Sequence, residues 1–202
     1  IFNEELKESY EMILGHFIAD RGEDVVVRPV TWSKDRNKVV YSVSSSSNPG
    51  EYWYFDKENI ILSFLWERSP WIDRTKLAKK VPMNYTARDG LEIYGYLTIP
   101  VGSDGKNLPM VVHPHGGPNA RDTMGYDPDV QFMANRGYVV FQPNFRGSTG
   151  YGAYHYISAN KQFGKTMQDD ITDGVNYLIE QGIADPDRIA IFGGSYGGYA
   201  TM

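Results

Sequence analysis

A serine flanked by glycines lies near the end of the sequence, in the run Gly193-Gly194-Ser195-Tyr196-Gly197-Gly198. Residues 189–192 before it are apolar and, with Arg188, predict a buried strand, and residues 199–202 after it suit the first turn of a helix. A serine at such a sharp turn has an exposed hydroxyl, and glycines leave room for the chain to reverse. Ser195 is therefore a candidate nucleophile for acyl transfer.

A second glycine-rich turn, His115-Gly116-Gly117-Pro118, follows the apolar residues 110–113. A serine hydrolase needs two backbone amides aimed at the oxyanion, one of them from the residue after the nucleophile. Tyr196 and Gly117 are the candidates. The serine pattern alone arises by chance in about one chain in seven of this composition, so the second turn carries most of the weight. Together the two turns indicate an α/β-hydrolase fold.

Two roles are open for His115. In the first, it is the general base that activates Ser195. In the second, its ring fixes the glycine loop through hydrogen bonds, which we favour because the order along this fold is serine, acid, then histidine. On that order the acid and the base are expected beyond Met202. Without them a serine hydroxyl is a weak nucleophile, so we expect the 202-residue chain to be inactive alone.

Composition and charge limit the partners and cofactors that this chain is expected to bind. The 202 residues carry a net charge of −5 without a basic block, so neither nucleic acid nor an anionic membrane is a favoured partner. The absence of cysteine excludes disulfides and thiolate sites, and the four histidines lack metal-ligand spacing, so we expect no metal and no organic cofactor. The sequence does not distinguish a cytoplasmic location from a bacterial periplasmic one. Assembly into a homo-oligomer is also left open.

The second half of the chain has the pattern of an α/β domain. Residues 83–87 and 91–99 predict a hairpin around Asp89-Gly90. Apolar runs at 110–113, 138–141 and 189–192 then alternate with helical patterns at 127–136 and 166–181. Strands buried on both faces and separated by helices predict a mostly parallel sheet.

The first 72 residues differ in pattern. Residues 3–17 predict an amphipathic helix with Asn3 as N-cap, and four short β-rich runs between 25 and 65 predict an antiparallel meander, with residues 44–50 among its turns. So small a meander is expected to be the end of a larger assembly such as a β-propeller. Residues 72–81, with four basic side chains, are interpreted as a solvated link.

These motifs resemble the prolyl oligopeptidase family of serine peptidases, in its acylaminoacyl-peptidase and dipeptidyl-peptidase-like branch. The resemblance rests on the two glycine turns and on two further segments, residues 144–152 (NFRGSTGYG) and 185–188 (DPDR). It implies the end of a β-propeller over residues 1–72 and the first part of an α/β-hydrolase catalytic domain over residues 73–202. It also implies oligopeptide substrates, with Ser195 as nucleophile and Gly117 and Tyr196 as oxyanion donors.

Two other functions stay open. A carboxylesterase would use the same fold and serine turn, although the β-rich first part favours a peptidase. In a non-catalytic interaction module, the serine turn would be retained without a catalytic role.

Overall fold

The computed structural model describes residues 4–202, which form two compact units. The first unit contains the chain up to Leu77 together with Gly125–Asp127, and the second contains Ala78–Met124 and Pro128–Met202. Within residues 4–202, no helix combines the length and apolar character that crossing a bilayer requires.

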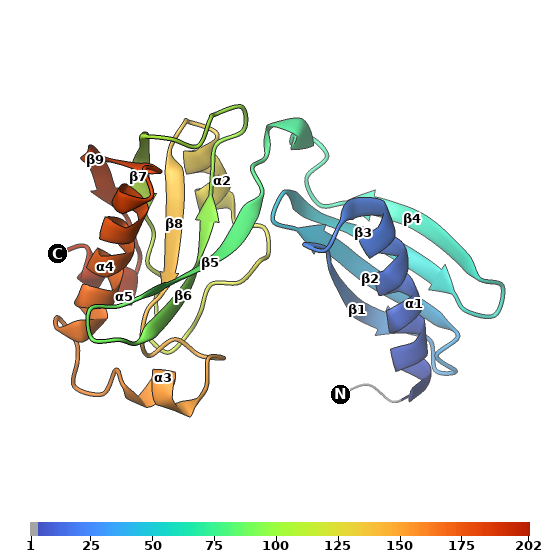
Figure 1. Cartoon of the computed structure of the whole chain (residues 1–202). Helices are drawn as coiled ribbons and strands as arrows, with labels where there is room; N and C mark the ends of the chain where they lie inside the picture. Colours follow the sequence, from blue (N-terminus) through green and yellow to red (C-terminus); the bar gives the residue numbers. More distant parts are fainter. Residues whose placement is uncertain (1–3) are drawn as a thin grey trace. The chain divides into compact units, whose positions relative to one another are not determined.

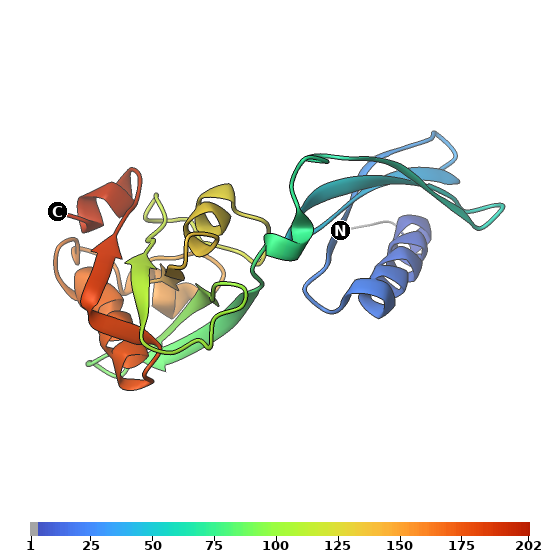
Figure 2. The same ribbon diagram turned by 90° about the horizontal axis from the view of Figure 1, so that it is seen from above.

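The first unit is a four-stranded antiparallel sheet with one helix (Figure 1). Helix α1 (Glu4–Arg21) runs along one face of the sheet, as Figure 2 shows. The strands pair in chain order, namely β1 (Val26–Trp32), β2 (Lys38–Ser45), β3 (Asn48–Asp56) and β4 (Ile61–Glu67). The predicted meander is confirmed, and the predicted N-cap, Asn3, lies outside the described residues.

One predicted turn of the meander is wrong. The segment 48–50 lies inside β3, because Ser45 pairs directly with Asn48 and leaves only two residues for the turn. Alternation places Val39, Tyr41 and Val43 of β2 in a core with Phe17 of α1, and all four are at most 1% exposed. Side chains at every second strand position point to the same face, which is why this alternation builds a core under the helix.

Glu51 is the charged centre of the first unit. Its side chain is 4% exposed and accepts hydrogen bonds from Arg21 Nη1 (2.8 Å), Trp53 Nε1 (2.7 Å), Asn48 Nδ2 (3.1 Å) and Arg74. Arg74, in the short 3₁₀ turn η1 (Arg74–Lys76), also pairs with Glu67. The predicted solvated link is therefore wrong at Arg74, whose charge is neutralised by two carboxylates.

We expect Glu51→Gln to lower the free energy of unfolding of this unit by about 3 kcal/mol, because two arginines lose a buried counter-ion. Burial raises the pKa of Glu51, but its hydrogen bonds with Arg74, Arg21 and Trp53 lower it overall below the ordinary 4.5. The stabilisation is therefore present above the unfolded-state pKa and is lost as pH falls through the lower folded value. Urea unfolding monitored by tryptophan fluorescence at pH 7 and pH 3 measures both effects. Glu58→Gln, on an exposed turn, is the matched control, and equal stability of the two variants would contradict the prediction.

The second unit is a five-stranded sheet with helices on both faces (Figure 1). Its strand order is β5-β6-β8-β7-β9, with bounds β5 (Lys80–Thr86), β6 (Glu92–Thr98), β7 (Leu108–Val112), β8 (Val139–Asn144) and β9 (Ala184–Ile191). Strands β8, β7 and β9 are parallel, whereas β5, β6 and β8 pair antiparallel. The sheet is thus mixed, and the predicted mostly parallel arrangement holds only for β8-β7-β9. The hairpin at Asp89-Gly90 makes β5 antiparallel to β6, and β6 also pairs antiparallel with β8.

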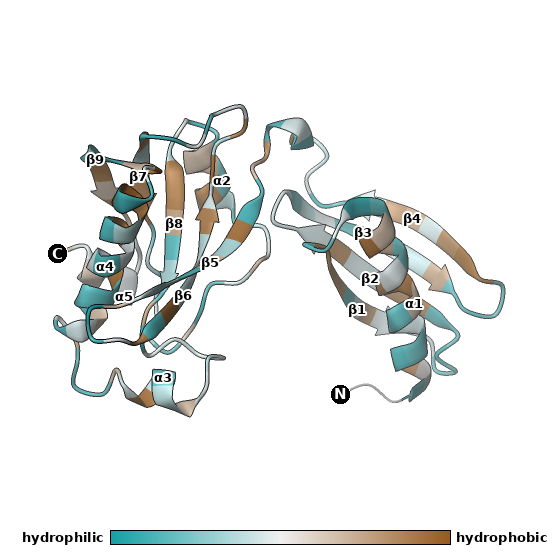
Figure 3. Ribbon diagram, viewed as in Figure 1, coloured by the Kyte–Doolittle hydropathy of each residue, from teal (hydrophilic) through white to brown (hydrophobic). Residues whose placement is uncertain are grey.

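Strand β8 separates two cores. Val139 and Phe141 pack with Met167, Ile171 and other residues of α4 (Thr166–Glu180), and α5 (Tyr196–Ala200) joins the same cluster. Val140 instead packs with α2 (Pro128–Ala134). The first half of β8 is coloured hydrophobic in Figure 3, as burial on both faces requires. The α/β character of this unit is confirmed.

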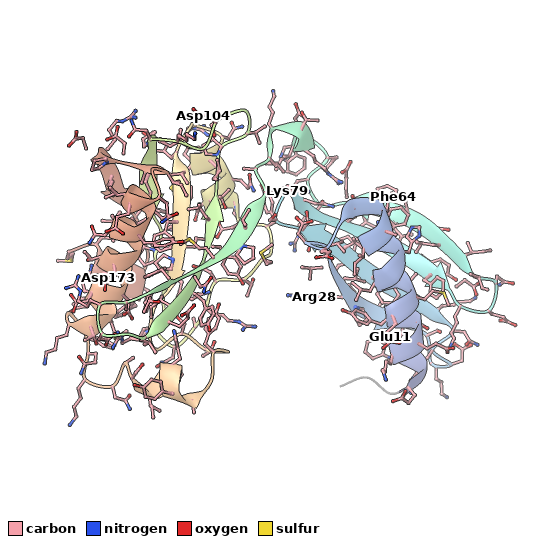
Figure 4. The ribbon with its side chains drawn as sticks, viewed as in Figure 1. Glu11, Arg28, Phe64, Lys79, Asp104 and Asp173 are labelled. Carbon is pink, nitrogen blue, oxygen red and sulfur yellow. The ribbon has the colours of Figure 1, made fainter. Side chains whose placement is uncertain are left out.

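Two charged side chains near the ends of β5 make hydrogen bonds within the second unit. Asp173 of α4, labelled in Figure 4, accepts a hydrogen bond from Arg88 Nη2 (2.7 Å) next to the β5–β6 turn. Lys80 is 4% exposed and donates to the carbonyl oxygen of Thr123 (3.0 Å), so it too is not the solvated charge that the sequence indicated. Helix α3 (Ala153–Ile157) was not expected from the sequence.

Candidate active site

Ser195 occupies the turn between β9 and α5, as predicted. Its backbone has φ 55° and ψ −121°, outside the regions that residues other than glycine ordinarily adopt, and its side chain is exposed. Holding a serine there costs on the order of 1–3 kcal/mol, so the surrounding structure must impose it. The strain presents the hydroxyl beyond the end of the sheet.

Two glycines of the turn are required by packing. A Cβ atom on Gly193 would lie 2.7 Å from the carbonyl carbon of Gly197. A Cβ atom on Gly197 would lie 2.1 Å from the carbonyl oxygen of Pro114. Because these neighbours are backbone atoms, no side-chain rotation relieves the clash. The segment before His115 is therefore in direct contact with the serine turn.

The loop that carries Gly117 faces the serine from the neighbouring strand. A Cβ atom added to Gly116 would lie 3.4 Å from Ser195 Cβ and 3.9 Å from its Oγ, so this glycine faces the serine side chain. Gly117 is exposed and has φ 126°, which only glycine adopts readily. Both loops follow parallel strands, because Val112 of β7 pairs with Ile191 of β9. The structure thus brings the loop of Gly117, Ser195 and Tyr196 to one edge of the sheet, where open α/β sheets bind ligands.

Both ring nitrogens of His115 are engaged within this loop. Nδ1 lies 2.7 Å from the carbonyl oxygen of Gly116 and must carry the hydrogen, since a carbonyl only accepts. Nε2 lies 2.8 Å from Ser148 Oγ, and the ring stacks on Phe145 with centroids 4.5 Å apart. Burial lowers the pKa of His115, although the Gly116 hydrogen bond opposes this, so the ring is neutral at pH 7. The structural reading of His115 is confirmed, and its ring does not contact Ser195 as a base.

The side chain of Tyr196 is buried behind the serine turn. It packs against Phe145 and Phe163, with ring centroids 5.2 and 5.0 Å away, and its hydroxyl lies 3.7 Å from Met167 Sδ. Burial raises the pKa of the Tyr196 phenol to about 12, so it stays protonated. This anchoring leaves the backbone amide of Tyr196, at the start of α5, as the group that can serve an oxyanion.

Within residues 4–202, no histidine makes a recorded hydrogen bond to Ser195. His113 Nδ1 lies 2.8 Å from a backbone carbonyl just past β9, and His155 is buried on α3. His16 lies on α1 of the first unit. The described residues therefore supply a strained serine and a glycine loop, but no base at the hydroxyl.

A third loop, residues 145–152, lies at the same end of the sheet, and the sequence did not indicate what it contributes to the site. Residues 145–152 follow β8, which is parallel to β7, so this loop lies beside the loop of Gly117. Ser148 contacts His115, and Arg146 forms a buried ion pair with Asp170. The only available signal was the position of the segment, directly after a strand of the parallel part of the sheet.

The site can now be compared with known proteins. The model of the prolyl oligopeptidase family matches residues 124–202. This match covers less than half of the chain and shows a likeness of residues 124–202 to that family. The resemblance read from the sequence is therefore confirmed, and the matched range contains Ser195 and Tyr196.

Relatives extend the likeness over most of the chain. Dipeptidyl aminopeptidase BIII of Pseudoxanthomonas mexicana is 36% identical over 179 residues, and dipeptidyl peptidase family member 6 of Caenorhabditis elegans is 34% identical over 194. These alignments cover 85% and 86% of this chain but only 26% of each relative. The chain thus spans about a quarter of the length of the relatives it matches.

Solved structures agree with this assignment. A puromycin hydrolase superposes with a TM-score of 0.70 at 28% identity, covering 82% of this chain and 26% of that one. The acylaminoacyl peptidase of Pyrococcus horikoshii gives a TM-score of 0.67 at 28% identity, covering 81% and 26%. The α/β fold is shared with these two structures.

Proposed function

We propose that this chain is part of a serine peptidase that cleaves oligopeptides through an acyl-enzyme on Ser195. The single observation that carries the proposal is the strained conformation of Ser195, which Gly116 of the neighbouring loop faces. Ser195 Oγ attacks the peptide carbonyl carbon, its proton passes to a general base, and the base returns it to the leaving nitrogen as the C–N bond breaks. Water then hydrolyses the ester.

The oxyanion of each tetrahedral intermediate is assigned to the backbone amides of Gly117 and Tyr196. Support comes from their placement on two loops that meet at Ser195, and from the buried Tyr196 ring, which fixes its own backbone. Preorganised amides stabilise the developing charge without reorganising during the reaction. Losing one such donor typically lowers kcat by about 10²–10³-fold.

The general base and its acid are assigned to residues outside the described set. This follows from the hydrogen bonds of His113 and His115, both of which engage groups other than Ser195. We therefore propose that the 202-residue chain by itself has an unreactive Ser195.

The antiparallel sheet of the first unit is proposed to be the end of a β-propeller, with the α/β-hydrolase domain beginning near residue 73. Support comes from the chain-order meander and from its edge strand β4, which leaves apolar side chains exposed, Phe64 (Figure 4) and Trp66 among them. Such a face is expected to pack against more β-structure.

The substrate class is proposed from the relatives, whose names describe dipeptidyl peptidases and acylamino-acid-releasing enzymes. We expect the full-length gene product to hydrolyse dipeptidyl or N-acyl-aminoacyl anilides with a kcat/KM at least about tenfold above that for p-nitrophenyl acetate, because remote peptide contacts supply transition-state binding. Measuring the three substrates with one enzyme preparation tests this. A preference for the simple ester would favour a carboxylesterase, and no hydrolysis of any would favour a non-catalytic module.

A further inference from the structure

The loop of residues 145–150 holds the loop of Gly117 at three points. The contacts are His115 Nε2 with Ser148 Oγ at 2.8 Å, Asn119 Nδ2 with the carbonyl oxygen of Gly147 at 3.1 Å, and the amide of Thr149 with the carbonyl oxygen of Ala120 at 2.9 Å. They bracket Gly117 on both sides along the chain. The position of its amide therefore depends on a segment that does not touch Ser195 in any recorded contact.

The supporting loop is itself anchored through Arg146. The backbone amide and Nε of Arg146 each donate to Asp170 Oδ2 at 2.9 Å, and Nη2 donates to Oδ1 at 2.7 Å. Nη1 also donates to Asp89 Oδ2 at 2.8 Å. Burial opposes the Arg146 charge, but the hydrogen bonds to Asp170 and Asp89 raise its pKa, so the guanidinium stays ionised. Helix α4 and the β5–β6 turn thus hold the loop from two directions.

Ser148 is the member of this loop that hydrogen-bonds with the ring of His115. It is fully buried, and its hydroxyl lies 2.8 Å from His115 Nε2 and 2.6 Å from the carbonyl oxygen of Phe145. In the neutral ring Nε2 is the acceptor, so the single hydroxyl hydrogen of Ser148 is shared between Nε2 and the carbonyl oxygen of Phe145. The opposite nitrogen then donates to the carbonyl oxygen of Gly116, which belongs to the peptide that contains the Gly117 amide.

We infer that Ser148 is a positioning residue for the oxyanion site: through His115 it sets the plane of the Gly116–Gly117 peptide and thereby aims the Gly117 amide. The inference rests on the proposed function. Because the peptide is planar, an oxygen held on one side fixes the direction of the N–H on the other. Freed from Ser148, the imidazole can turn about its side-chain bonds, and the peptide loses its fixed direction.

The test is Ser148→Ala in the full-length gene product. We expect kcat for the best peptide substrate to fall about tenfold with KM changed by less than about twofold, because the affected donor acts in the transition state. Affinity for a matching peptide boronic acid, whose tetrahedral adduct carries an oxygen in the oxyanion position, falls by the same factor. Active-site titration corrects kcat for any unfolded fraction.

Ser158→Ala is the matched control. Its hydroxyl also donates to the carbonyl oxygen three residues earlier, that of His155 (2.9 Å), but it does not contact the Gly117 loop, so its kcat stays unchanged. Should Ser148→Ala fail to fold, Asn119→Ala removes another of the three contacts from an exposed position, with an expected fall in kcat of about threefold.

An unchanged kcat per titrated site in the variant that folds, or a change in KM alone, would overturn the inference. So would a fall in kcat without weaker boronic acid binding. Ser195→Ala, made in parallel, reports on the proposed function instead: full activity in that variant rejects the serine mechanism whatever Ser148 does.

Discussion

Ser195→Ala in the full-length gene product is expected to lower kcat for a peptide substrate by roughly 10⁴–10⁶-fold. The alanine retains the turn but has no oxygen to form the acyl-enzyme, so only binding and the two amides remain to act on the scissile bond. KM should change little, because the hydroxyl contributes mainly to the transition state. Steady-state kinetics with a chromogenic peptide anilide measure both constants.

A matched serine variant makes this result specific. Ser103, whose hydroxyl donates to the carbonyl oxygen of Pro100 (2.8 Å), lies in the loop between β6 and β7. Ser103→Ala should retain the kcat of the unmodified protein. Retention of even a tenth of the activity in Ser195→Ala would assign the nucleophile to another residue.

Gly197→Ala is expected to be the most disruptive single-methyl change at the site. The added Cβ would lie 2.1 Å from the carbonyl oxygen of Pro114, so the serine turn and the His115 loop must separate. Overpacking of this kind lowers the free energy of unfolding by roughly 1–3 kcal/mol. A displacement near 1 Å between nucleophile and amide also lowers kcat by about 10²-fold. Thermal unfolding and active-site-titrated kinetics measure the two effects.

Gly194→Ala is the stability control for this change. A Cβ atom on Gly194 would meet nothing within 4 Å, so its unfolding midpoint should match that of the unmodified protein. Equal midpoints for Gly194→Ala and Gly197→Ala would show that the two loops are not packed as described.

Local patterns were sufficient for most of the elements. The Asp89-Gly90 hairpin, the meander and α4 all follow from turn residues and apolar periodicity, which act within a few residues. Long-range pairing was not accessible in this way. The antiparallel contact of β6 with β8 and the ion pairs of Arg74 depend on which segments meet in space, and a local pattern carries no such information.

The site shows the same division. Ser195 and the loop of Gly117 were recognised because each needs glycines at fixed offsets after a strand. Ser148 supports that loop through His115, which follows a different strand, and Arg146 is anchored to Asp170 of α4, 24 positions further along the chain. Only the folded chain shows that the glycine-rich segment 144–152 supports the loop of Gly117.

Labelling with a fluorophosphonate probe, followed by peptide mapping, tests the central claim most directly. In the full-length gene product we expect one label, on Ser195, that is absent from Ser195→Ala and forms far more slowly on the 202-residue chain, because the described residues place no base at the hydroxyl. A label on another residue, or equally rapid labelling of Ser195 in the 202-residue chain, would contradict the account.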